Sequence, residues 1–299
     1  MTWSVNPTTV TYHAHIATPT GIPTDPALTS YGEKQAEQLG EHIATLHPQL
    51  SQIYSSPYYR CLQTLKPGVE RLLKRGYSRG VIVDNGFEEW YGETGDHREH
   101  PRPAPFEELR DAHFPSLQLR QLERAVIKSS RFGESIQQLH ERIAYALHRI
   151  IELADRDGAT SILICTHAAA MIAIGRTLTG TMPEDVDTED FKCFTAGLSR
   201  YDRTGGVSVP TGEVALWDAA RERDIPDVGW KDGKGIMGGW DCVLNSDCSF
   251  LDGGEERGWH FSGDESFLRS SGPDGCVVER GLQTEFDGKG DAIGKGSRL

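Results

Sequence analysis

The chain has 299 residues, 37% hydrophobic and 25% charged, with a formal net charge of -13 at pH 7. This length allows at least one full core or two domains, whereas the acidic balance disfavours direct nucleic-acid binding, which relies on clustered Lys and Arg. No apolar run approaches the roughly 20 residues of a membrane span and no secretory leader is evident, so we expect an intracellular protein of the cytoplasm or nucleus.

The six cysteines are scattered and form no CxxC pair. We therefore expect reduced thiols rather than a disulfide framework or a zinc site, which fits a reducing compartment. No metal or other cofactor is predicted. Cys165 stands two positions before His167, but it lies in an apolar strand where a thiolate is disfavoured, so we expect it to pack in the core.

The first predicted elements alternate between helix and strand. Apolar residues recur near the helical period over residues 28–46, and Thr29 is placed to cap this helix. Residues 52–55 form a short predicted strand, and a proline then opens a helix over residues 58–73. A β-branched run over residues 79–84 predicts a buried strand.

The next segment, residues 92–130, is polar and rich in His, Arg and Pro, which indicates an insertion with a short helix near 117–127. A long helix is predicted over residues 135–153, with Gly158 as its stop, followed by an apolar strand at 161–165. Apolar strands that alternate with helices predict an α/β fold, with a mostly parallel sheet flanked by helices on both faces.

After residue 203 the sequence becomes rich in Gly and Asp, which predicts a boundary near residue 205. We expect an α/β domain over residues 1–204 and a C-terminal extension over 205–299, with short strands at about 214–262. The apolar islands in the extension are 214–217, 240–244 and 250–251. Residues 264–299 have too few apolar side chains to offset chain entropy, so disorder is expected there.

Two predicted strands end beside side chains that suit an anion. Arg60 lies on the first turn of the helix after strand 52–55, where backbone N–H groups and a guanidinium can hold phosphate oxygens. His167 follows strand 161–165, and the alanines after it leave room around the imidazole. Each has an ordinary alternative, because Arg60 could be a surface arginine and His167 a hydrogen-bonded structural residue.

A pair of carboxylates follows the strand at 79–84. Glu88 and Glu89 lie between Phe87 and Trp90, where apolar surroundings can raise a carboxyl pKa and so suit a general acid. The alternative is an ordinary surface pair.

Together these motifs resemble the histidine phosphatase, or phosphoglycerate mutase-like, superfamily. The matching segments are DPALTSYGEKQA from residue 25, SSPYYRCLQT from residue 55, GFEEW from residue 86 and THAA from residue 166. The resemblance covers about residues 21–180. The FEEW segment is most similar to the branch with the Sts-type phosphatases and the tau-subunit phosphatase-like domain of the RNA polymerase III assembly factor.

The resemblance implies hydrolysis of a phosphomonoester through a phosphohistidine, without a metal. By position, Arg60 and His167 would bind the phosphate, and Glu89 would give a proton to the leaving oxygen. Glu88 is the less favoured acid. The implied ligand is phosphate or a phosphomonoester.

The nucleophile of that family stands in an Arg-His-Gly motif, and no such motif precedes the LTxxG segment at residues 28–32. Only His13 and His15 offer a replacement nucleophile, and that segment lacks the preceding arginine. We interpret the chain as starting downstream of the strand that carries the motif, with impaired activity. Residues 9–13 are then expected to enter the sheet imperfectly, or the place of that strand stays open.

Two functions follow from these observations. The first is a phosphomonoesterase. The second is a non-catalytic scaffold or subunit of an RNA polymerase III transcription factor complex, with a protein partner at the C-terminal extension, where 240–244, 249–251 and 259–261 could accept a partner strand. These segments could instead pack on the chain's own core. Nucleic-acid binding through the basic stretch at 97–102 ranks last.

Overall fold

The computed structural model describes residues 3–6, 9–94, 98–122, 126–205 and 214–262. All of them belong to one compact unit, Met1–Leu268. The predicted disorder of residues 264–299 lies outside the described residues.

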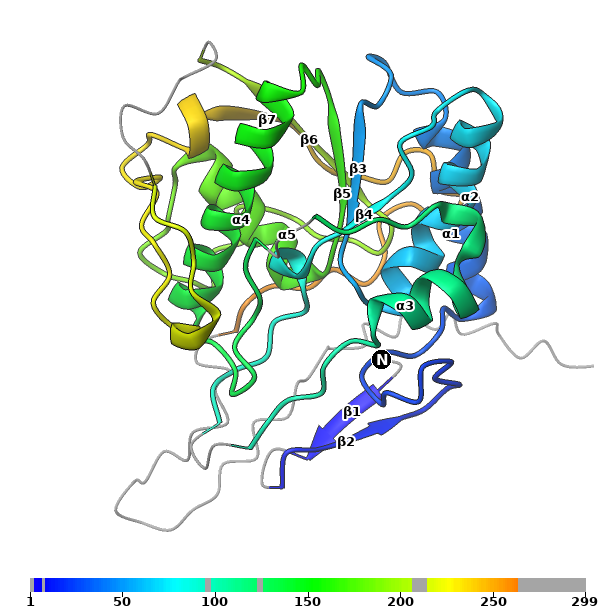
Figure 1. Ribbon diagram of the computed structural model, residues 1–299, viewed down its shortest axis with the longest axis horizontal. Coiled ribbons are helices and arrows are strands. Elements are labelled where there is room, and N and C mark those ends of the chain that lie inside the picture. Colours follow the sequence, from blue (N-terminus) through cyan, green and yellow to red (C-terminus); the bar gives the residue numbers. More distant parts are fainter. Residues whose placement is uncertain (1–2, 7–8, 95–97, 123–125, 206–213, 263–299) are drawn as a thin grey trace, which may run out of the picture. The chain divides into compact units, whose positions relative to one another are not determined.

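A small parallel sheet stands at the centre of this unit (Figure 1). Its strands are β3 (Gln52–Ser55), β4 (Ile82–Val83) and β5 (Ile162–Cys165), in the order β4-β3-β5. Ser55 pairs with Val83 on one side and with Cys165 on the other, so the three strands end at the same edge. The predicted α/β class with a parallel sheet is confirmed.

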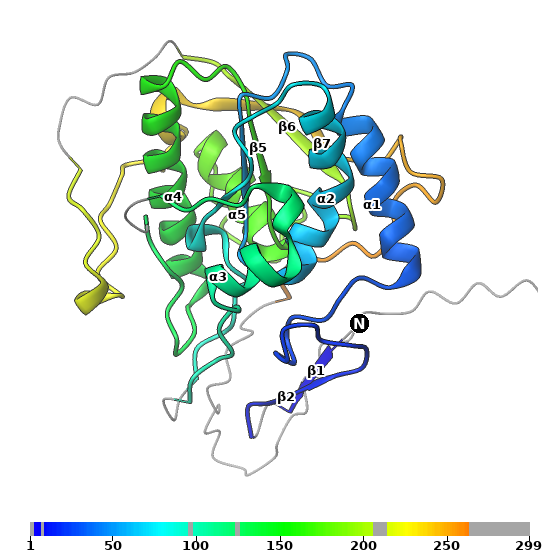
Figure 2. The same ribbon diagram turned by 45° about the vertical axis from the view of Figure 1, so that its right-hand side comes forward.

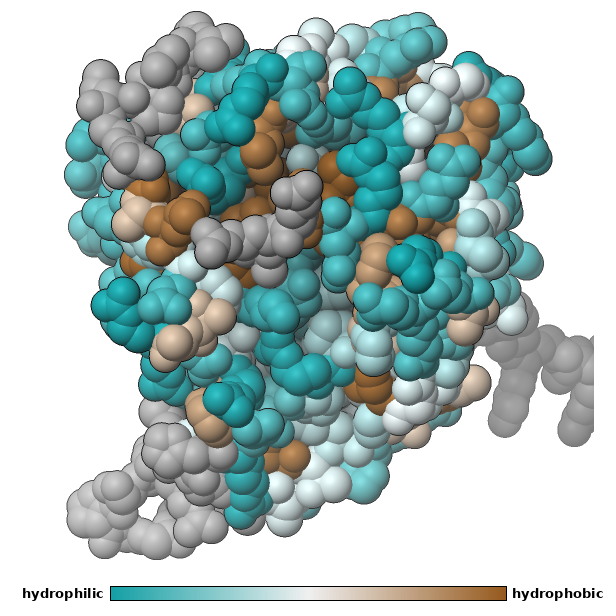
Figure 3. Space-filling model, viewed as in Figure 1, coloured by the Kyte–Doolittle hydropathy of each residue, from teal (hydrophilic) through white to brown (hydrophobic). Residues whose placement is uncertain are grey.

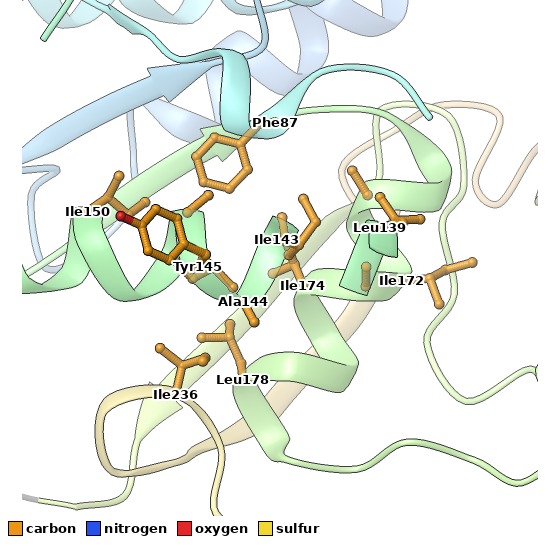
Figure 4. Packing of buried hydrophobic residues seen from close by; sticks show 14 of the residues in the cluster. Phe87, Leu139, Ile143, Ala144, Tyr145, Ile150, Ile172, Ile174, Leu178 and Ile236 are labelled. Carbon is orange, nitrogen blue, oxygen red and sulfur yellow. The ribbon is translucent and has the colours of Figure 1, made fainter. Parts of the chain in front are cut away.

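Four helices pack against the two faces of the sheet (Figures 1 and 2). They are α1 (Ser30–Ile43), α2 (Tyr59–Lys74), α4 (Ile136–Arg156) and α5 (Ala168–Thr179). Ile53 and Leu163 pack in one hydrophobic cluster with α1 and α2, while Tyr54 and Ile164 pack in another with α4 and α5. Figure 4 shows the second cluster. Because side chains alternate along a strand, both faces of the sheet are covered.

Local capping signals mark the start of α1 and the start and end of α4. The Thr29 side chain accepts a hydrogen bond from the Gly32 N–H at the start of α1. Ser135 and Gln138 form a capping box at the start of α4. That helix ends at Arg156, and Gly158 follows with a φ of +66°, as its predicted role as a stop requires.

The predicted helix at 117–127 is wrong. Helical turns occur earlier, as α3 (Phe106–Glu108), a π turn (Leu109–His113) and a 3-10 turn (Pro115–Leu117), and the described residues from Gln118 to Ile127 hold no helix. Leu109, Phe114 and Leu117 are buried in the cluster of α1 and α2. Their position is therefore set by tertiary packing, which local periodicity does not reveal.

An antiparallel hairpin precedes the first helix. It consists of β1 (Trp3–Asn6) and β2 (Thr11–Ala14), and its register places His13 opposite Ser4. Residues 9–13 therefore do not enter the parallel sheet, so the first of the two expected alternatives is wrong. Within the described residues, β5 pairs with β3 alone.

A second antiparallel pair follows α5. It joins β6 (Leu198–Arg203) to β7 (Trp240–Asp247), with 3-10 turns at Ala219–Arg221 and Ile236–Gly238; another such turn, Asn85–Phe87, follows β4. The island at 240–244 lies in β7, whereas 214–217 and 250–251 are not strands. Trp230, Ile236 and Phe261 are buried in the cluster of α4 and α5. The division of the chain at residue 204 stays a proposal.

The surface is largely hydrophilic on the face shown in Figure 3, with apolar side chains in scattered groups. Large hydrophobic side chains that are more than a third exposed include Leu216, Val243 and Leu244. No helix in the described residues has the length and apolar character needed to span a membrane.

Candidate functional site

The ends of the parallel strands bring the predicted site residues together. Ser55 ends β3 opposite Cys165, the last residue of β5. Arg60 lies on the first turn of α2 and His167 is the residue just before α5, while the loop after β4 carries Glu89. Their convergence at the carboxyl edge of the sheet agrees with the general position of ligand sites in open α/β folds.

Arg60 has partners on both sides of its guanidinium. Nη2 donates to Glu89 Oε2 at 2.8 Å, and Nη1 donates to the Thr24 carbonyl at 2.7 Å and to Asp25 Oδ1 at 3.3 Å. The guanidinium carbon lies 4.7 Å from the centre of the Tyr58 ring, a cation–π contact. Burial opposes the charge, but the neighbouring carboxylates outweigh it and raise the pKa of Arg60. Arg60 is thus a well-anchored cation.

His167 is buried and contacts both other site residues. Its Nε2 lies 2.7 Å from Ser56 Oγ, and its Nδ1 lies 3.2 Å from Glu89 Oε2 and 3.0 Å from Arg60 Nη2. Burial lowers its pKa, but the Cys61 sulfur and the Glu89 carboxylate raise the pKa of His167 to about 9. We therefore assign an imidazolium at neutral pH, which donates from Nδ1 to Glu89 and from Nε2 to Ser56. The 3.0 Å approach of Arg60 Nη2 to Nδ1 is then a contact between two donors that share Glu89 Oε2 as acceptor, not a hydrogen bond.

Glu89 accepts hydrogen bonds at both carboxylate oxygens. Oε2 faces Arg60 and His167, while Oε1 accepts from the Trp90 backbone N–H at 3.1 Å. Burial raises its pKa, but the two cations more than offset this and hold the pKa of Glu89 at about 2. Glu89 is therefore ionised here at neutral pH, and its role as an acid stays a prediction that requires a higher pKa.

Glu88 points to other partners. Its buried carboxylate accepts from Ser129 Oγ at 2.5 Å, lies 3.0 Å from Arg102 Nη2 and contacts the Asn85 side-chain amide. These partners come from the insertion and from the loop itself. Glu88 thus links the loop to the insertion, whereas Glu89 faces the cations.

Two residues of the site had no role assigned from the sequence, although both lie in the motifs singled out there. Asp25 accepts from the backbone N–H groups of Tyr59 and Arg60, at 2.8 and 3.4 Å, and so caps α2 from a distant segment. Burial raises the pKa of Asp25, against the opposing effect of Arg60. Ser56 binds the His167 ring. Their positions in the DPALT and SSP motifs could have singled out Asp25 and Ser56. The groups that they bind lie far away in the sequence, so these contacts could not be inferred from it.

A buried ion pair holds the loop after β4. Arg142 bonds both carboxylate oxygens of Glu134, the shortest contact being 2.8 Å, and donates to the carbonyls of Gly86 at 2.7 Å and Glu88 at 3.4 Å. Trp90 Nε1 donates to the Glu134 carbonyl at 2.9 Å. This network fixes the backbone that carries the carboxylates. No local pattern in the sequence predicts this ion pair, because an arginine in an amphipathic helix is ordinarily exposed.

The two histidines proposed as a replacement nucleophile lie in another place. His13 is on β2 and His15 just beyond it, and both are exposed. The contacts that the structure describes connect neither of them to Arg60 or His167. Their role as a nucleophile stays a prediction.

The hairpin is anchored through Tyr12, whose hydroxyl lies 2.6 Å from His100 Nδ1. His100 Nε2 donates to the Gly92 carbonyl at 2.8 Å, so Nδ1 accepts from Tyr12. Burial lowers the pKa of His100, in agreement with a neutral ring. Within the basic stretch at 97–102, His100 is thus buried and Arg102 is paired with Glu88, while residue 97 lies outside the described residues.

The thiols near the site are free. Cys61 Sγ lies 3.7 Å from His167 Nε2, and a hydrogen bond with Cys165, together with burial, raises the pKa of Cys61. Cys165 is partly buried against the cluster of α1 and α2, as expected for a core thiol. In the part of the chain that the structure describes, no group of three or more His, Cys, Asp or Glu side chains could hold a metal.

The arrangement can bind an oxyanion by charge and hydrogen bonding. Arg60 and His167 supply two cations, and the single Glu89 carboxylate now pairs with both and offsets part of their charge. An oxyanion that takes the place of this carboxylate would gain charge-assisted hydrogen bonds from a guanidinium and an imidazolium.

Comparison with known proteins shows the family and several relatives of the chain. The family model described as the histidine phosphatase superfamily (branch 1) matches residues 13–211. Among curated relatives, the transcription factor tau 55 kDa subunit of Saccharomyces cerevisiae is 26% identical over 274 residues, which cover 89% of this chain and 56% of the relative. The ecdysteroid-phosphate phosphatase of Drosophila melanogaster is 28% identical over 174 residues, 56% of this chain and 22% of that protein. The chain thus spans about half, or less, of these relatives.

Among solved structures, the chain is similar to the ecdysone phosphate phosphatase from Bombix mori, crystallised with tungstate. The TM-score is 0.45 and the identity 20%, over 56% of this chain and 62% of that one. The phosphoglycerate mutase from Bacillus anthracis gives a TM-score of 0.36 and 16% identity, over 55% and 72%.

Proposed function

Because the chain belongs to branch 1 of the histidine phosphatase superfamily, we propose that Arg60 and His167 bind the phosphate group of a phosphomonoester. The proposal rests on one observation: Arg60, His167 and Glu89, which are distant in the sequence, converge at the carboxyl edge of the sheet. Neither a metal nor another cofactor has a part in it.

Glu89 would supply the proton for the leaving oxygen. In the present arrangement its pKa is about 2, because two cations face it. A phosphate dianion between Glu89 and these cations would reverse the local field and raise that pKa. Binding of the dianion would then be coupled to proton uptake by the residue that later gives the proton away.

Hydrolysis by this chain is proposed to be impaired. The family reaction needs a histidine nucleophile in line with the phosphorus, and the sequence holds no Arg-His-Gly before its LTxxG segment. His13 lies on strand β2 of the hairpin and His15 just after it, and both side chains are exposed. We expect phosphate binding to persist and turnover of an aryl phosphate to be weak or absent.

Binding can be tested with tungstate, a phosphate mimic, by isothermal titration calorimetry. Arg60→Ala and His167→Ala should each lower the affinity by at least tenfold, since each removes a charge-assisted contact worth about 1.5–3 kcal/mol. Arg71→Ala is the matched control, because Arg71 lies on the same helix and pairs with Glu37 and Glu41. Equal affinity in all three variants would overturn the proposed site.

Turnover can be tested with p-nitrophenyl phosphate. If His15 or His13 acts as the nucleophile, the His15→Ala or His13→Ala variant loses the activity that the unchanged chain shows. We expect neither variant to differ from the unchanged chain. A phosphohistidine trapped at either position would show a replacement nucleophile and an active enzyme.

A second function is favoured by the extent of one match. The tau 55 kDa subunit matches 89% of the chain, whereas the ecdysteroid-phosphate phosphatase matches 56%. The alternative is therefore a nuclear, non-catalytic subunit of an RNA polymerase III transcription factor complex. Its protein partner would bind the C-terminal extension at β7, where Val243 and Leu244 are 47% and 39% exposed.

This alternative predicts that partner binding and anion binding depend on different residues, so that a substitution can remove one and leave the other. Proteins captured with the tagged chain should be lost with Val243→Asp/Leu244→Asp and kept with Arg60→Ala. If both variants keep the same proteins, β7 is not the partner surface.

A further inference from the structure

The C-terminal extension reaches the anion site through two aromatic rings. Phe261, which is 1% exposed, lies against Trp90 with the ring centres 5.5 Å apart and the planes at 74°. Trp90 follows Glu89 directly in the chain. The contact therefore joins a residue near the end of the described chain to the loop that carries the central carboxylate of the site.

Trp90 transmits this contact to Glu89 through its backbone. Its N–H donates to Glu89 Oε1 at 3.1 Å, while its indole Nε1 donates to the Glu134 carbonyl at 2.9 Å. The indole is thus held at its nitrogen by Glu134 and at its ring by Phe261. Rotation of the ring alone would leave the backbone N–H in place, because that N–H lies in the planar peptide group. A shift of the whole Trp90 residue, which these two contacts oppose, would move the N–H away from Oε1.

Phe261 is itself held firmly by the segment that contains it. Trp259 packs on it with ring centres 4.9 Å apart, and the Arg176 guanidinium lies 5.5 Å from its ring centre. The Cys193 thiol bonds the Trp259 carbonyl at 2.9 Å. Further back, the Glu256 carbonyl accepts from the Thr195 N–H at 3.0 Å. These contacts fix the segment across α5 and the loop that follows it.

We infer that Phe261 is a positioning residue for Glu89, so that the C-terminal extension completes the oxyanion site. The inference rests on the proposed function in one respect only, namely that Arg60 and His167 bind an oxyanion in competition with Glu89. It assigns the extension a role in the site that is independent of any partner protein.

The ordinary alternative is that Phe261 only fills the core. A core role predicts lower stability and unchanged site chemistry, whereas a positioning role predicts a change at Glu89 in the folded protein. Ile236 is a suitable control, since it is buried in the same cluster. Figure 4 places it beside Leu178, at the opposite end of the view from Phe87.

The first experiment measures tungstate affinity for the full chain and for Phe261→Ala, Phe261→Leu and Ile236→Ala, each at a temperature where circular dichroism shows a folded sample. Phe261→Ala should strengthen binding by up to about tenfold, because a displaced Glu89 carboxylate competes less well with the anion for Arg60 and His167. Phe261→Leu should show a smaller gain, and Ile236→Ala should lower the melting temperature without changing affinity. Unchanged or weaker affinity in folded Phe261→Ala, or an equal gain in Ile236→Ala, would overturn the inference.

The second experiment does not depend on anion binding. The carboxyl carbon of Glu89 is followed by NMR between pH 3 and 7, with its signal assigned by Glu89→Gln. In the unchanged chain this carboxyl should remain ionised, whereas Phe261→Ala should show it titrating toward the ordinary pKa of 4.5. A Glu89 signal identical in the two proteins refutes positioning, even if neither protein binds tungstate. Failure of the unchanged chain to bind tungstate refutes only the proposed function.

Discussion

At the scale of single residues, the Arg60 guanidinium shares its charge between two carboxylates of the same chain. Glu89 lies 2.8 Å and Asp25 3.3 Å from it, and the Glu89 carboxylate also lies 3.2 Å from His167. Because the four groups are close and partly shielded from water, their charges are strongly linked. An oxyanion can bind only if it competes with Glu89 for the same donors.

Replacement of Glu89 by Gln should therefore improve anion binding. Sulfate is a suitable probe, because it stays a dianion over the whole pH range of the experiment. In the unchanged chain, sulfate affinity should rise as the pH falls, since the bound dianion raises the Glu89 pKa and binding takes up a proton. Glu89→Gln should raise affinity about tenfold at pH 7, the equivalent of one pKa unit, and flatten this rise.

The neighbouring carboxylate provides the control for this experiment. Glu88 bonds Ser129 and Arg102 instead of the site cations. Glu88→Gln should leave both the affinity for sulfate and its pH dependence unchanged. Calorimetric titrations at pH 5, 6, 7 and 8 test this, and a Glu89→Gln variant that binds sulfate no better than the unchanged chain contradicts the competition.

His167 should make stability depend on pH in the alkaline range. Its folded pKa of about 9 exceeds the ordinary value of 6.5, so the folded state holds the proton more tightly. This contribution is fully present below pH 6.5 and is lost as the pH rises through 9. Urea unfolding at pH 6, 7.5 and 9 should show falling stability, and His167→Gln should remove that slope. A slope unchanged in His167→Gln would assign the effect to another group.

At the scale of elements, α2 depends on a residue outside its own sequence. Its N-cap residue, Tyr58, makes no side-chain capping bond, and the Asp25 carboxylate accepts from the first N–H groups instead. A helix start favours negative charge, so this carboxylate also suits the helix dipole. The start of α2 and the position of Arg60 are thus fixed together.

Asp25→Ala should lower the free energy of unfolding by about 1–2 kcal/mol, the usual cost of a lost cap. It should also change tungstate affinity, because the Arg60 guanidinium loses one of its holding groups. Ser135→Ala removes the cap of α4 and should cost a similar amount of stability without changing affinity. Chemical unfolding and calorimetry of both variants check this, and equal affinities would show that Asp25 serves the helix alone.

Elements with local signals could be predicted closely from the sequence. α1 begins after Thr29, α4 after Ser135, and the apolar strand at 162–165 lies where its composition places it. The turns from Phe106 to Leu117 could not be predicted in this way, because their conformation depends on burial of their apolar side chains against α1 and α2. The hairpin also depends on a distant partner, since Tyr12 is bound by His100.

The same distinction applies to the candidate site. Arg60, His167 and Glu89 could be located because each follows a strand within a motif of fixed spacing. The residues that fix the positions of these side chains could not be located from the sequence. Arg142, for example, lies on another element and donates to the carbonyls of Gly86 and Glu88. Long-range contacts of this kind leave no periodic trace in the chain.

At the scale of the whole molecule, residues beyond the proposed boundary at 204 are part of the main core. Trp230, Ile236 and Phe261 are each at most 2% exposed and pack in the cluster of α4 and α5. The Arg203 guanidinium meanwhile binds Asp155 at the end of α4 at 2.8 Å and the carbonyl of Met237. The α/β layers and the extension therefore share one hydrophobic interior.

A fragment of residues 1–204 should consequently fail to fold cooperatively. Burial of one large apolar side chain is worth about 1.5–3 kcal/mol, so the loss of these three approaches the roughly 5–15 kcal/mol that stabilises a whole domain. A chain that ends at residue 262 keeps all three and should show a thermal transition and a near-ultraviolet dichroism spectrum close to those of the full chain. If the fragment of residues 1–204 melts cooperatively near the same temperature, the proposed division at residue 204 holds, and the packing of Trp230, Ile236 and Phe261 adds little to stability.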